Sequence, residues 1–128
     1  MNQAAGLQSV TAWVDMAVLR QFLPDDLAVI ASFLQQVAIE GARNLSAAQR
    51  LLREGDRQGL ASQLHRLAGS CQLLKIVKIT DELLQLEALV DAGEEVAILQ
   101  MRLDDVQNNF DDFTQTVQLM TSLSSRQP

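Results

Sequence analysis

The chain has 128 residues and a formal net charge of −6, which suits one domain that buries about two-thirds of its unfolded surface without a disulfide or a metal. An acidic chain lacks the concentrated basic face that binding to a phosphate backbone requires, so nucleic acid is not an expected partner. One histidine and one cysteine cannot supply the usual zinc ligands, and without an apolar run of about 18 residues no membrane span is expected.

The first predicted helix covers residues 10–22, where apolar side chains recur at helical spacing. It stops at Leu23-Pro24, because proline disfavours a helical conformation in the residue before it. Residues 1–9 are predicted to form a flexible N-terminus.

A long second helix is predicted to begin at a cap supplied by Asp25 or Asp26 and to run as far as Glu54, where Gly55 ends it. Gly41 lies near the middle of this segment. We expect it to be tolerated there as a weak spot instead of forming a turn.

The third helix is predicted to start after a cap at Asp56 and to weaken over residues 74–77. A fourth helix is expected over about residues 79–90, before a break at residues 91–93. The last helix is predicted to begin near Glu94, because acidic residues favour a helix N-terminus.

The predicted fold class is all-α, because helix formers dominate and no alternating β-branched run occurs. Four substantial helices with short connections pack as antiparallel neighbours. We therefore predict an antiparallel up-down four-helix bundle over residues 10–120, with the short N-terminal helix capping one end. Residues 121–128 are predicted to form a flexible C-terminal tail.

His65 is predicted to face solvent from the third helix. Winding residues 58–74 at about 100° per residue places an apolar stripe on one side and His65 roughly 140° from its centre. The helical neighbours of the imidazole are small or uncharged, so a partner protein could reach it. The predicted docking face consists of Gln58, Ala61, Ser62, Ala68, Gly69 and Gln72.

Gly69 supports this interpretation, because a glycine inside a helix costs about 1 kcal/mol relative to alanine and no turn is expected there. Close approach of another surface would account for that cost, although an accidental glycine beside a surface histidine is the simpler alternative. Cys71 lies on the apolar stripe and is interpreted as a small core residue. Ser62 and Ser70 lack a recognisable setting for nucleophilic catalysis.

The third helix carries the segment His65-Arg66-Leu67-Ala68-Gly69-Ser70-Cys71, followed by Leu74 and by Leu86-Glu87. This pattern resembles the histidine-containing phosphotransfer (HPt) domain of bacterial multistep phosphorelays. The resemblance covers about residues 10–118 and includes the leading helix and the turn at Gly55-Asp56. It implies the same helical bundle that the periodicity predicts.

Two positions depart from the family pattern. Ala68 stands where many members have a lysine near the phosphoryl group, and Lys75 stands where a glycine is usual. Arg66 and Lys75, which cluster with Lys78, could supply the missing positive charge, with solvated surface charge as the alternative for each. Lys75 must either adopt the left-handed backbone that glycine favours or let the helix run on.

The resemblance implies a carrier of phosphoryl groups. Nε2 of His65 would accept a phosphoryl group from the aspartate of a receiver domain, in a hybrid sensor kinase for example, and pass it to the aspartate of a response regulator. The receiver would supply the Mg²⁺, so this chain is expected to bind no cofactor and no metal. It is not expected to be an enzyme, because no Gly-rich loop for ATP phosphates is present.

Glu87 is expected to accept a hydrogen bond from Nδ1–H of His65, which would leave Nε2 free as the nucleophile. An exposed glutamate in an ordinary helix is the alternative. The alternative function is a bundle that binds receiver domains without being phosphorylated. We expect a monomer without direct membrane contact, located in the cytoplasm, either free-standing or as the C-terminal module of an inner-membrane hybrid sensor kinase.

Overall fold

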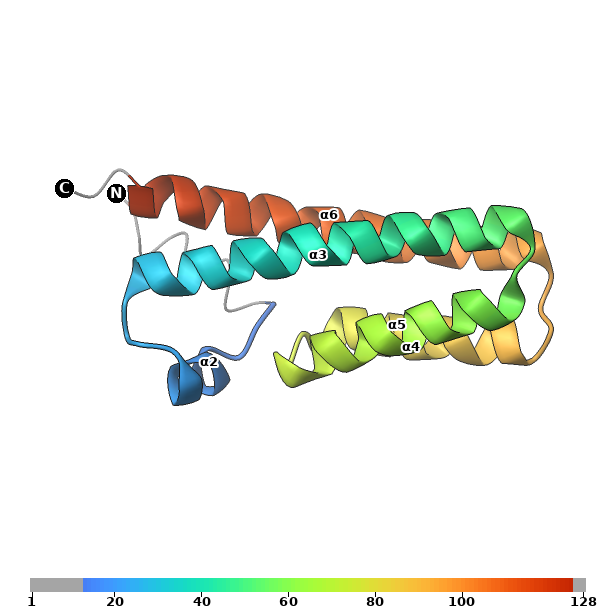
Figure 1. Cartoon of the computed structure of the whole chain (residues 1–128), viewed down its shortest axis with the longest axis horizontal. Helices are drawn as coiled ribbons and strands as arrows, with labels where there is room; N and C mark the ends of the chain where they lie inside the picture. The colour runs from blue at the N-terminus through green and yellow to red at the C-terminus, as the bar shows by residue number, and fades with distance from the viewer. Residues whose placement is uncertain (1–12, 126–128) are drawn as a thin grey trace.

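The computed structural model describes residues 13–125, and these residues form helices and connecting turns without a strand. The helices are α2 (Met16–Phe22), α3 (Leu27–Glu54), α4 (Arg57–Leu73), α5 (Val77–Asp91) and α6 (Val96–Ser125). Figure 1 shows α3 lying beside α6, α4 lying beside α5, and α2 standing at one end of the molecule. The predicted all-α class is confirmed.

Helix α2 begins at Met16 and not at residue 10 as predicted. Asp15 sets this start, because its Oδ1 accepts a hydrogen bond from the backbone N–H of Ala17 at 2.9 Å. Trp13 and Val14 form a turn and a bend before the helix. Residues 10–12 and the predicted N-terminus at 1–9 lie outside the described residues.

Helix α3 runs without a break through Gly41, as predicted. Its N-terminus is capped by Asp26, and Gly55 ends it in the left-handed conformation with φ of 75°. Gly41 is buried where α3 lies against α6, and a Cβ built there would overlap the ring of Phe110. The glycine is therefore required by close packing of the two helices.

We expect Gly41→Ala to lower the free energy of unfolding by about 1–3 kcal/mol, because the added methyl group overpacks the contact with Phe110. Chemical denaturation of the purified variant measures this. Unchanged or increased stability, which the helix propensity of alanine alone would give, would contradict the packing role.

Helix α4 starts after Asp56, whose Oδ1 accepts from the N–H of Gly59 at 2.8 Å, and it ends at Leu73. Lys75 then adopts φ of 58°, so of the two predicted alternatives it takes the left-handed backbone. Helix α5 begins at residue 77, two residues before the predicted start. The buried side chain of Ile76 anchors the turn between the two helices.

Helix α6 continues to Ser125, so residues 121–125 of the predicted flexible tail are helical. Val117 and Met120 are buried at helical spacing, so the apolar face of α6 reaches the last residue of the predicted bundle. Residues 126–128 lie outside the described residues.

The core contains the apolar faces of all the described helices, with Phe110 and Phe113 fully buried between them. Their ring centroids lie 5.6 Å apart, and Trp13 meets Phe113 edge-on at 5.9 Å. Cys71 is a free, buried cysteine, as interpreted from the stripe, and burial raises the pKa of its thiol to about 12.

Between residues 13 and 125, no single helix has both the length and the apolar character to cross a membrane. The pair α2 and α3 would pass the same test by length and composition together, but the two helices are bent by 105° at their junction.

Candidate functional site

The imidazole of His65 projects from the middle of α4, and 72% of its side chain is exposed. Gln58, Ser62, Gly69 and Gln72 are also exposed on this helix, and Ala61 is half-buried. These residues occupy the accessible face on which the sequence placed them.

Gly69 has open space around it, because a Cβ built there would have nothing within 4 Å. The fold itself does not require a glycine at this position. Gly69 therefore differs from Gly41, which is packed against another helix, and from Gly55, which has positive φ.

Ala68 does not belong to the accessible face, because it is 2% exposed and lies in the core. The prediction failed since Ala68 is at the edge of the apolar stripe and α5 packs closely along α4. A small side chain suits such a close helix contact. Ala68 therefore contributes neither charge nor accessible surface near His65.

Glu87 on α5 reaches the imidazole, with its Oε1 3.2 Å from Nδ1 of His65. The glutamate side chain is only 21% exposed, whereas that of His65 is 72% exposed. An ionised carboxylate can only accept a hydrogen bond, so Nδ1 carries the proton in this contact. In the neutral imidazole, the other ring nitrogen, Nε2, then has the lone pair.

A shallow hollow surrounds His65 and Glu87 between α4 and α5. Its lining also includes Arg57, Val90 and Asp91, which the sequence analysis missed. Val90 and Asp91 could have been found, because they follow Glu87 by three and four residues and thus share its helix face. Nη2 of Arg57 donates to the carbonyl oxygen of Glu94, so Arg57 also braces the turn after α5.

Of the predicted basic cluster, only Arg66 lines the hollow around His65. Lys75 and Lys78 line a different hollow beside Trp13, with Nζ of Lys78 5.7 Å from the Trp13 ring centroid. The structure therefore does not bring Lys75 to His65, because the helix from His65 to the end of α4 is about 12 Å long. Of the two predicted sources of phosphoryl charge, Arg66 lies at His65 and Lys75 lies beside Trp13.

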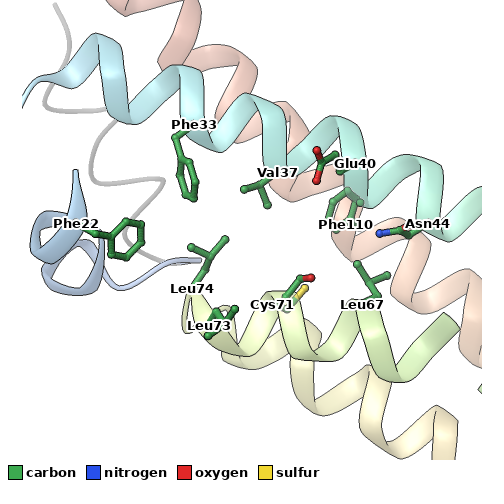
Figure 2. A pocket seen from close by; sticks show the side chains of 12 residues that line it. Phe22, Phe33, Val37, Glu40, Asn44, Leu67, Cys71, Leu73, Leu74 and Phe110 are labelled. Carbon is green, nitrogen blue, oxygen red and sulfur yellow. The ribbon is translucent and has the colours of Figure 1, made fainter. Parts of the chain in front are cut away.

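A second hollow of about 460 Å³ lies between α2, α3 and α4 and is mostly apolar. Figure 2 shows Phe22 of α2 and Phe33 of α3 on one side of it and Leu73, the last residue of α4, and the following Leu74 on another. Phe22 is 54% exposed and Leu73 is 76% exposed. The adjacent Leu73-Leu74 pair was a signal for this surface, since neighbouring residues on a helix cannot both face the core.

His65, Gly69 and Leu73 are spaced four residues apart on α4, so they form one row along its outer face. We call this row the α4 outer row. It leads from the imidazole past the open space at Gly69 to the apolar hollow. The described residues hold no group of three His, Cys, Asp or Glu side chains that could bind a metal ion.

A family model described as Hpt domain matches residues 16–118. The matched segment contains α2 to α5, most of α6 and every residue of the α4 outer row. No curated protein and no solved structure matches the chain.

Proposed function

The chain belongs to the Hpt domain family, whose members act as phosphocarrier modules in phosphorelays and not as catalysts, and we propose that His65 is its phosphoacceptor. The observation that carries this proposal is the contact of Nδ1 with Glu87 at 3.2 Å on an imidazole that is otherwise exposed. The carboxylate favours the tautomer in which Nε2 has a lone pair for nucleophilic attack.

In the proposed transfer, Nε2 of His65 attacks the phosphorus of an aspartyl phosphate on a receiver domain. The new N–P bond forms as the P–O bond to the aspartyl oxygen breaks, and the aspartate leaves as a carboxylate with the bonding electron pair. No proton has to leave the imidazole, because Nδ1–H remains bonded to Glu87. The reverse reaction passes the group to the aspartate of a response regulator, and the receivers supply Mg²⁺.

The α4 outer row and the apolar hollow beside it are the proposed docking surface for the receiver. Exposed Phe22 and Leu73 offer apolar area to a partner, and Gly69 allows its surface to approach α4 closely. Gln58 and Ser62 line the hollow around the imidazole with uncharged polar groups, and Gln72 lies about two turns further along α4. This surface begins at the nucleophile, as a transfer between two proteins requires.

Arg66 is the proposed partner of the phosphoryl group, because a phosphorylated histidine carries close to two negative charges that a nearby guanidinium stabilises. Arg66 lines the hollow around His65, and Ala68 supplies no charge. The loss of the usual lysine is the observation that favours the alternative function, a bundle that binds receivers without phosphorylation.

The experiment that separates these functions is incubation with a panel of phosphorylated receiver domains and Mg²⁺. We expect acid-labile, base-stable phosphate on His65, located by mass spectrometry. Binding to a receiver without any label would support the unphosphorylated interaction module instead.

We expect Glu87→Leu to slow transfer about tenfold, because a hydrogen bond to a charged group contributes about 1.5 kcal/mol. Single-turnover transfer from a phosphorylated receiver measures the rate. Glu87→Gln is the matched control, since its amide oxygen still accepts from Nδ1–H, and it should keep most of the rate. Equal rates in the leucine variant and the unmodified protein would show that Glu87 does not orient the imidazole.

The antiparallel up-down order of α3 to α6 is also part of the proposal. It is supported by the short connections at residues 55–56, 74–76 and 92–95, which leave each helix to start beside the end of the one before. A monomeric state and a cytoplasmic location, free-standing or within a hybrid sensor kinase, complete the proposed context.

A further inference from the structure

Gln63 is a buried polar side chain in the contact between α3 and α4, with only 9% of the residue exposed. Its Nε2 lies 3.0 Å from Oδ1 of Asn44 and 3.4 Å from the carbonyl oxygen of Asn44. Its Oε1 accepts a hydrogen bond from Nη2 of Arg66 at 3.1 Å. Both ends of the amide therefore have partners, one on each helix.

The orientation of this amide is determined by its surroundings. The backbone carbonyl of Asn44 can only accept a hydrogen bond, so the NH₂ end of Gln63 must face α3. The oxygen end then faces Arg66, whose guanidinium can only donate. Asn44 and Gln63 thus form a fixed acceptor for the side chain next to His65.

The acceptor formed by Gln63 restricts the side chain of Arg66, the cation next to His65. A free arginine side chain has considerable rotamer freedom, which it loses when it holds a phosphoryl group. One nitrogen bonded to Gln63 leaves the remaining N–H groups of the guanidinium for other acceptors. Arg57, the other arginine of the hollow, has Nη2 bonded to the carbonyl oxygen of Glu94, and its Nη1 is buried.

We propose that Gln63, held in place by Asn44, is a positioning residue that keeps the Arg66 guanidinium at the edge of the His65 hollow, where it stabilises the phosphoryl group during transfer. This inference rests on the proposed function. In this proposal Arg66, the residue that follows the histidine, supplies the charge of the missing lysine, and the buried amide of Gln63 on α4 holds Arg66 in place.

The test compares Gln63→Met with Arg66→Met in single-turnover transfer from a phosphorylated receiver. Methionine keeps the volume of Gln63 and removes all three of its side-chain hydrogen bonds. We expect each variant to lower the transfer rate at saturating receiver by about five- to tenfold, with the half-saturating receiver concentration unchanged. The double variant should be no slower than Arg66→Met alone, because both changes remove the same interaction.

Gln49→Met is the matched control. Gln49 is also an amide with both ends bonded between two helices, since its Nε2 donates to Asp104 at 3.3 Å and its Oε1 accepts from Gln100 at 2.9 Å. It links α3 to α6, away from His65, so we expect the full transfer rate. The ³¹P resonance of phosphohistidine should move in the Gln63 and Arg66 variants and stay in place in the Gln49 variant.

Full transfer rates in Gln63→Met, or rate losses that multiply in the double variant, would overturn the positioning role. If Gln63→Met loses helicity, Asn44→Leu tests the same link from α3 and should slow transfer by about two- to threefold. If the unmodified protein takes no label, the proposed function itself is overturned. If it takes label but the rate losses of the two variants multiply, only the positioning role of Gln63 is overturned.

Discussion

Replacing His65 with glutamine should abolish phosphoryl acceptance and leave helicity and melting unchanged. The imidazole is the proposed nucleophile, and glutamine offers no lone pair of comparable reactivity. Its side chain is 72% exposed and does not belong to the hydrophobic core, so the core does not depend on it. Labelling by a phosphorylated receiver and circular dichroism measure the two effects.

The control for this variant moves the histidine to another helix. Gln115 is exposed on α6, and the double variant His65→Gln, Gln115→His carries a solvent-facing imidazole away from α4. We expect no label on it, because the receiver docks along the α4 outer row. Unchanged labelling of His65→Gln would show that His65 is not the acceptor.

Gly69→Glu should slow transfer by about ten- to a hundredfold while the bundle stays folded. The substitution places bulk where the receiver approaches α4, and overpacking of a contact costs about 1–3 kcal/mol. The fold has room for the new side chain, since a Cβ at Gly69 has nothing within 4 Å. Transfer rates and thermal melting separate the two effects.

Gly69→Lys distinguishes bulk from charge, because it adds a side chain of similar length with the opposite sign. Gly69→Ala is the smaller control and should raise stability by up to about 1 kcal/mol. Retention of the transfer rate in both large variants would show that the receiver does not approach this part of α4.

The exposure of His65 and Gly69 could be predicted from the sequence because it depends on helical periodicity, which a single helix determines. The burial of Ala68 could not. It lies at the margin of the apolar stripe, and whether a margin is covered depends on the neighbouring helix, here α5. Lys75 lies beyond the end of α4, about 12 Å along the helix from His65, and lines the hollow beside Trp13.

Contacts between helices could be predicted from the sequence to different degrees. The Glu87 contact was expected only through a family resemblance, because periodicity does not say which residues face each other across two helices. No sequence pattern predicted the hydrogen bonds that link Asn44 through Gln63 to Arg66. They depend on the rotamers of three polar side chains, and in the sequence such residues look like ordinary surface positions.

The reactivity of Cys71 can report transient opening of the core. Cys71 is the one cysteine in the chain, and a thiol with a pKa near 12 presents almost no reactive thiolate while the bundle is closed. Alkylation of the native protein therefore measures how often the core around α4 becomes exposed to solvent. The raised pKa also means that stability contributed by the protonated thiol is present below pH 9.0 and is lost as the pH rises towards about 12.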